Sequence, residues 1–214
     1  MFACRAIALT MLTDLYAPFL LTTLLIELTP GPNMAWLALT GASYGKRSGF
    51  AAVSGIALGL ALLAAASAVG LAELATRSPF VFGLLRYAGV AYLLWLAWKA
   101  LAGNDELSPD IANKNALSAW FWHGLLLNLL NPKAAVFFIT VLPAYISTAV
   151  PIAPQTGLLS ASYVAIATAI HLLIVAFAGH AHGWISVGDR SHIIRRIFAG
   201  LLAAIAIWFL FSTA

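Results

Sequence analysis

The chain has 214 residues, of which 63% are hydrophobic and only 8% are charged. A soluble globular domain is typically about 45–50% apolar and about 25% charged, so this composition excludes an ordinary soluble protein and indicates lipid as the main solvent. The 11 basic residues do not suffice for the clustered basic face of a nucleic-acid-binding protein, and the single cysteine, Cys4, excludes an internal disulfide and a cysteine-based metal cluster.

Residues 1–13 form an N-terminal extension to which we assign no function. They contain one charged residue, Arg5, and an apolar stretch too weak for a cleavable signal peptide. Met11 is an alternative start of the chain, because the apolar stretch that follows needs nothing before it.

A membrane-spanning helix needs about 20 predominantly apolar residues. Six stretches meet this requirement: 15–39, 49–72, 79–101, 119–146, 154–180 and 193–212. A polar loop, 103–117, separates a first half, 14–102, from a second half, 118–214, with three spans each. An odd number of spans gives the two halves opposite orientations, so the sequence predicts an all-α membrane protein built as two inverted three-helix repeats.

The basic residues predict which side of the membrane each loop faces, because cytoplasmic loops are enriched in Lys and Arg. With both termini outside, the segments facing the cytoplasm carry Lys46, Arg47, Lys99, Lys114, Arg190, Arg195 and Arg196. The outer segments then carry only Arg5 and Arg77, with Arg86 inside the third span. We therefore expect an N-out, C-out protein whose polar loop 103–117 is cytoplasmic.

The first span is interrupted by Thr29-Pro30-Gly31-Pro32-Asn33. Proline lacks the backbone N–H and breaks a helix, which a membrane protein tolerates only where protein or a water-filled cavity supplies partners. The helix end after the break has free N–H groups that suit a substrate carboxylate, and Thr29 and Asn33 add side-chain hydrogen bonds. The alternative is a packed proline kink, which two prolines around a glycine disfavour.

The fourth span is interrupted at a matching place by Asn131-Pro132-Lys133, with Asn128 on the same stretch. Paired interruptions in the two halves of a membrane protein indicate the central binding site of a transporter. Lys133 would hold a carboxylate or pair with Glu27; the alternative is a lysine whose ammonium reaches the membrane interface.

Glu27 precedes Pro30 by about one helical turn, well inside the first span. A carboxylate in a membrane span is costly and indicates a functional site by default. We expect Glu27 to bind a substrate ammonium or to take up and release a proton. The alternative is a structural ion pair with Arg86 of the third span, which would run parallel to the first.

Other motifs admit simpler interpretations. A series of glycines at helical spacing predicts close helix packing and would permit a homodimer: Gly41, Gly45, Gly49, Gly55 and Gly59. Residues 41–45 also fit the G-x-S-x-G pattern of a serine hydrolase, with Ser43 as nucleophile and His171 or His180 as base. Ser43 lies at a span end beside two basic residues, which disfavours this interpretation. The five histidines fit packing or interface positions, and we expect no metal site.

Several motifs in order resemble the LysE/RhtB family of amino-acid exporters. The resembling segments are 28–33, 45–59, 84–93, 124–128, 131–133 and 137–143, so the resemblance covers the chain from about Met11 to its end. The resemblance implies a carrier of the bacterial inner membrane that exports amino acids or close derivatives, driven by the proton gradient, with no enzymatic activity and no cofactor. It maps the family's core motifs onto Pro30, Gly31, Pro32, Asn131, Pro132 and Lys133. A passive small-solute channel and the intramembrane serine hydrolase are the alternative functions.

Overall fold

The computed structural model describes residues 2–68, 78–102, 114–147, 151–185 and 191–212. Seven α-helices account for most of them: α1 (Phe2–Leu28), α2 (Pro32–Ala68), α4 (Pro79–Ala102), α5 (Lys114–Leu129), α6 (Pro132–Val136), α7 (Ile152–Ile185) and α8 (Ser191–Ser212). A π-helical turn, η2 (Phe137–Val141), and a 3-10 turn, η3 (Leu142–Tyr145), follow α6. No strand occurs among these residues, which confirms the all-helical prediction. Most of the predicted polar loop, residues 103–113, lies outside the described part.

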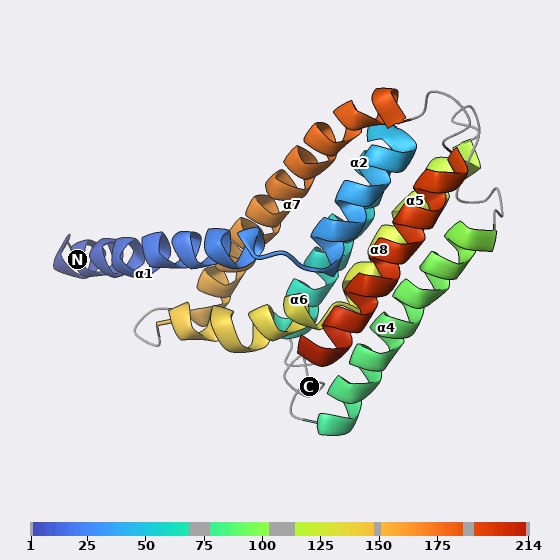
Figure 1. Cartoon of the computed structure of the whole chain (residues 1–214). Helices are drawn as coiled ribbons and strands as arrows, with labels where there is room; N and C mark the ends of the chain where they lie inside the picture. The colour runs from blue at the N-terminus through green and yellow to red at the C-terminus, as the bar shows by residue number, and fades with distance from the viewer. Residues whose placement is uncertain (1, 69–77, 103–113, 148–150, 186–190, 213–214) are drawn as a thin grey trace.

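The helix α2 consists of two arms that meet at Gly45. The backbone of Gly45 has φ 82° and ψ 174°, a left-handed conformation that glycine adopts without steric cost. Both arms meet the same residue of α5: the Asn33 amide bonds to Asn128, and a Cβ added at Gly59 would lie 2.7 Å from Asn128 Nδ2. The chain therefore reverses at Gly45, as the light-blue and teal segments of Figure 1 illustrate.

By length and composition alone, without regard to the reversal at Gly45, two of the described helices could each cross a membrane, namely α2 and the Ile152–His180 part of α7. A third crossing results if the pair Leu117–Leu129 and Lys133–Tyr145, bent by 53°, is counted as one span. Large apolar side chains are exposed along several helices, among them Tyr87, Trp98, Leu173, Phe177 and Phe211. These features fit a protein surrounded by lipid, and the division into six spans stays a prediction.

Glycines bring α2 close to α5 and α7. A Cβ at Gly55 would meet the Phe121 carbonyl of α5, and a Cβ at Gly49 would meet the Val175 side chain of α7. Gly124 of α5 faces the Ala52 carbonyl in the same way. Because backbones can approach this closely only without a side chain between them, Gly49 and Gly55 pack helices within one chain, as predicted. The helical spacing predicted through Gly45 is wrong, because Gly45 forms the reversal of α2.

Two segments point away from the bundle side by side: α1 and the stretch from α6 to η3 (Figure 1). Phe19 of α1 packs edge-on against Tyr145, with ring centroids 5.3 Å apart, and also contacts Phe137 at 6.0 Å. Thr22 and Tyr145 share a hydrogen bond of 2.7 Å between their hydroxyl oxygens. The first break therefore separates α1 from the bundle, and the second break leads out of it.

The segments predicted to face the cytoplasm lie at one end of the bundle. The reversal within α2, the end of α4, the start of α5, the end of α7 and the start of α8 all lie at the top of Figure 1. There the Lys46 ammonium lies 3.2 Å from His180 Nε2, which joins α2 to α7. These segment ends thus lie on one side of the bundle, as a common membrane face requires.

We expect Gly55→Ala to destabilise the protein, because the added methyl group would lie against the Phe121 carbonyl and 2.8 Å from Leu125 N. Overpacking of this kind typically costs about 1–3 kcal/mol. The midpoint of thermal unfolding in detergent checks this. Gly157→Ala in α7 is the matched control, because a Cβ there meets nothing within 4 Å. A midpoint for Gly55→Ala at or above that of Gly157→Ala would contradict the close approach of α2 and α5.

Candidate functional site

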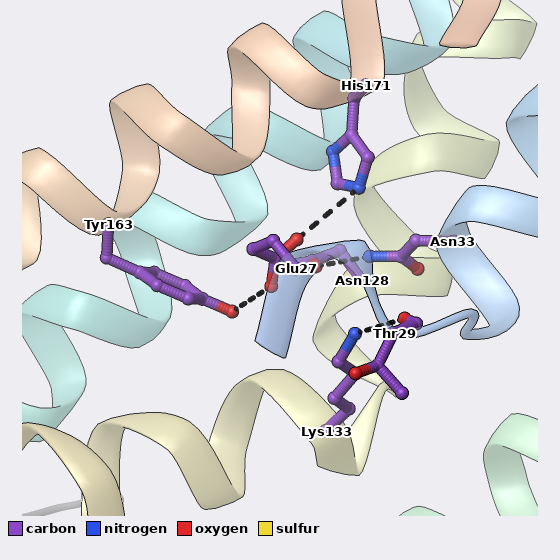
Figure 2. Close-up of polar contacts among 7 residues, drawn as sticks. All are labelled: Glu27, Thr29, Asn33, Asn128, Lys133, Tyr163 and His171. Carbon is purple, nitrogen blue, oxygen red and sulfur yellow. Dashed lines mark hydrogen bonds and ion pairs between the residues drawn. The ribbon is translucent and has the colours of Figure 1, made fainter. Parts of the chain in front are cut away.

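The first break frees a carbonyl group that the second break binds. The helix α1 ends at Leu28, and α2 begins at Pro32. The Thr29 hydroxyl still donates to the Leu25 carbonyl at 3.0 Å, but the Thr29 carbonyl has no continuing helix to bond. The Lys133 ammonium donates to that carbonyl at 2.9 Å. Figure 2 shows this bridge between the two interrupted spans.

Gly31 makes room for the bridge. A Cβ at Gly31 would lie 3.4 Å from Lys133 Cδ and 3.6 Å from Nζ, so the lysine stem passes directly over the glycine. Lys133 therefore points toward the first break rather than toward the membrane interface. Among the described side chains it forms no ion pair with Glu27 within 4.0 Å.

The second break is closed by a helix cap. The Asn131 side-chain oxygen accepts a hydrogen bond of 3.0 Å from the Lys133 backbone N–H, and Pro132 occupies the first position of α6. Asn is among the preferred N-cap residues, and proline suits the first helical turn because its missing N–H has no partner there. The cap fixes where α6 starts and therefore where Lys133 lies.

Glu27 is buried, with 5% of its surface exposed, and both of its oxygens face α7. The Tyr163 hydroxyl donates to Oε1 at 2.8 Å, and His171 Nε2 lies 3.8 Å from Oε2. The Tyr163 ring stacks on Phe137 with centroids 3.7 Å apart, which holds its hydroxyl in this direction. Figure 2 shows Glu27 between the two α7 side chains.

An amide pair lies beside the carboxylate. Asn33 Nδ2 of α2 donates to Asn128 Oδ1 of α5 at 2.9 Å, and both side chains are buried. Asn33 Oδ1 and Asn128 Nδ2 have no hydrogen-bond partner among the described atoms. A buried polar atom without a partner costs free energy. Asn128 Nδ2 faces Gly59 of α2.

These groups line one small cavity between the two breaks. Its lining residues are Glu27, Gly31, Asn33, Met34, Leu60, Asn131, Lys133, Ala134, Tyr163 and His171. The cavity has room for about one water molecule, so an amino acid would enter only after the surrounding helices move apart. It combines an acid and a base with an apolar wall formed by Met34, Leu60 and Ala134.

The structure brings together part of the predicted site. Of the residues proposed from the sequence, Glu27, Gly31, Asn33, Asn131 and Lys133 line the cavity, with Asn128 directly behind Asn33. The side chains of Thr29 and Pro30 are exposed, Thr29 contributing through its carbonyl, and Pro32 is buried at the start of α2.

Some expectations concern side chains outside the described part. The side chain of Arg86 is one of these, so the expected Glu27–Arg86 ion pair lies beyond what the structure describes, as does the Pro132 ring. Within the described residues, no group of three His, Cys, Asp or Glu side chains is arranged to hold a metal ion.

Five cavity residues were not proposed from the sequence as part of this site: the apolar Met34, Leu60 and Ala134, and the polar Tyr163 and His171 of α7. His171 lies well inside an apolar stretch, and an ionisable side chain there indicates function by default. That rule would have selected His171, whereas nothing in the local sequence of Tyr163 distinguishes it from a packing residue.

Comparison with known proteins identifies the family. The family model described as LysE type translocator matches residues 24–213. The chain belongs to the LysE type translocator family. As a LysE type translocator it is a multi-pass membrane transporter and not an enzyme, so the serine hydrolase interpretation of Ser43 is wrong.

Individual relatives of this LysE type translocator are similar over most of its length. A homoserine/homoserine lactone efflux protein of Salmonella typhimurium is 28% identical over 86% of this chain and 89% of its own. A membrane protein of Pseudomonas aeruginosa is 32% identical over 78% of this chain and 80% of its own. A leucine efflux protein of Klebsiella pneumoniae is 33% identical over 61% and 63%. No solved structure matches the chain.

We expect Asn131→Ala to lower stability by about 0.5–2 kcal/mol, because it removes the cap of α6. Asn131→Ser is the matched control, because serine is also a preferred N-cap residue and restores an acceptor for the Lys133 N–H. Thermal unfolding in detergent measures both variants. If the two variants lowered the midpoint of thermal unfolding equally, the Asn131 cap would not contribute to the stability of the protein.

Proposed function

We propose that this protein is a secondary active transporter that exports amino acids or close derivatives across the bacterial inner membrane, coupled to protons. The observation that carries the proposal is a cavity between two helix breaks that contains one carboxylate, Glu27, and one ammonium, Lys133. Such a pair matches the opposite charges of a zwitterion. The names of the homoserine and leucine efflux relatives support this substrate class.

In this proposal, the substrate carboxylate binds at Lys133 and at the N-terminal end of α2. Lys133 uses one N–H to bond the Thr29 carbonyl, and an ammonium has three. The start of α2 adds backbone N–H groups and the positive end of the helix dipole. The substrate ammonium binds at Glu27, which carries the only carboxylate among the cavity-lining residues.

The substrate side chain faces Met34, Leu60 and Ala134 in the same cavity. None of these residues is charged, so the proposed site favours substrates whose side chains carry no charge. Homoserine and leucine, named for two relatives, both meet this condition. A lysine or arginine substrate would leave its second cation without a partner in this wall.

Transport requires the cavity to open alternately to the two sides. We propose six spans in two inverted repeats, with rocking of one half against the other around the site. A common cytoplasmic face, with both termini outside, is supported by what lies at one end of the bundle. That end contains the Lys46–His180 contact, the ends of α4 and α7, and the starts of α5 and α8.

Uptake of labelled amino acids into inverted membrane vesicles tests the proposal. We expect gradient-dependent accumulation of neutral amino acids, including L-homoserine or L-leucine, and little accumulation of L-lysine or L-arginine. Vesicles without the protein and vesicles treated with a protonophore are the controls. Flux that does not saturate and does not depend on the proton gradient would indicate a passive channel instead. No flux of any amino acid through correctly inserted protein would reject the proposed substrate class.

We expect Lys133→Met to weaken transport of L-homoserine much more than transport of L-homoserine lactone, because the lactone has no free carboxylate. A hydrogen bond to a charged group contributes about 1.5–3 kcal/mol, which corresponds to roughly a tenfold to hundredfold rise in KM for homoserine. The KM for the lactone should change by less than about threefold on the same scale. Equal losses for both substrates would indicate that Lys133 only holds the two breaks together.

A further inference from the structure

One of the two carboxylate oxygens of Glu27 accepts a short hydrogen bond from the protein, and the other has only a longer contact. Oε1 accepts the Tyr163 hydroxyl at 2.8 Å, whereas Oε2 lies 3.8 Å from His171 Nε2. That distance is too long for a direct hydrogen bond but short enough for an ion pair with a protonated ring. His171 is 2% exposed, and its Nδ1 has no partner among the described atoms.

We propose that the imidazolium of His171 and the ammonium of the substrate occupy Glu27 Oε2 alternately, and that this competition couples export to proton entry. The inference rests on the proposed function and names the residue that carries the proton. Glu27 then serves as the shared counter-ion. The Tyr163 hydroxyl fits this role, because it donates its hydrogen to the carboxylate.

Charged and polar groups surround His171 from several helices. Glu27 faces it from α1, Lys133 lines the same cavity from α6, and Tyr163 does so from α7 itself. The neighbouring helices α2 and α5 contribute the neutral amides of Asn33 and Asn128. With a single carboxylate among these groups, only one of two cations can be paired at a time, and a cation left unpaired in a membrane interior is costly.

The cycle balances in protons and charge. On the cytoplasmic side, the substrate ammonium takes Glu27 Oε2, and the His171 N–H bond breaks as its proton leaves to the cytoplasm. On the outer side, His171 takes up a proton, its imidazolium returns to Glu27, and the substrate leaves. One proton enters for each zwitterion exported, so each turnover moves one positive charge inward.

Proton release on substrate binding tests the inference directly. Purified protein in weakly buffered detergent at mildly acidic pH, where histidines titrate, receives L-homoserine while a dye reports pH. We expect the wild type to release up to one proton per bound substrate and His171→Gln to release none. Glutamine keeps an N–H donor near Glu27 but cannot titrate. His180→Asn is the control, because it removes an exposed histidine from the same helix.

Transport by proteoliposomes separates coupling from folding. His171→Gln should lower proton-driven accumulation of L-homoserine at least about tenfold more than it lowers the exchange of internal for external L-homoserine. His171→Asn is a second neutral variant, in case the first fails to fold. Proton-driven accumulation that survives in a folded variant would overturn the inference, as would equal loss of exchange and accumulation. Failure of the wild type to move any substrate would instead reject the proposed function.

Discussion

The architecture of the site depends on one requirement, which is that backbone groups freed by a helix break must find partners where no water is present. The prolines of the first break leave the Thr29 carbonyl without a helical donor, and Lys133 supplies one from the second break. The second break in turn depends on the Asn131 cap. The first interruption is therefore satisfied partly by the second half of the chain, and the second by its own cap, which places both at the same cavity.

Close helix packing makes this arrangement possible. The glycines of α2 allow its returning arm to approach α5 and α7, and the reversal at Gly45 places Asn33 and Gly59 against the same residue, Asn128. Proteins in lipid lack a hydrophobic driving force between helices, so van der Waals contact between small residues carries more of the stability. Gly31 likewise allows a close contact within the site, because the aliphatic part of Lys133 packs where a side chain on residue 31 would lie.

The electrostatics of the cavity follow from its small number of charges. Glu27 is held by Tyr163, whose ring is fixed by stacking on Phe137 of the π-helical turn after the second break. The same carboxylate faces His171 at 3.8 Å. In the mechanism that we propose, this single anion acts as a switch, because binding one cation displaces another. This links the geometry of the breaks to transport by the LysE type translocator.

The sequence by itself determined the membrane environment, the helical class and the two places, before Pro32 and before Pro132, at which one helix ends and the next begins. These follow from composition and from local backbone rules, since proline lacks the N–H that continues a helix. Two prolines around a glycine end α1 before Pro32, whereas the single Pro18 lies inside α1. The tertiary structure alone decided that Asn131 caps a helix, that Asn33 pairs with Asn128, and that Tyr163 and His171 face Glu27. Such contacts depend on the rotation and register of one helix against another, which packing across the whole bundle sets and no short stretch of sequence encodes.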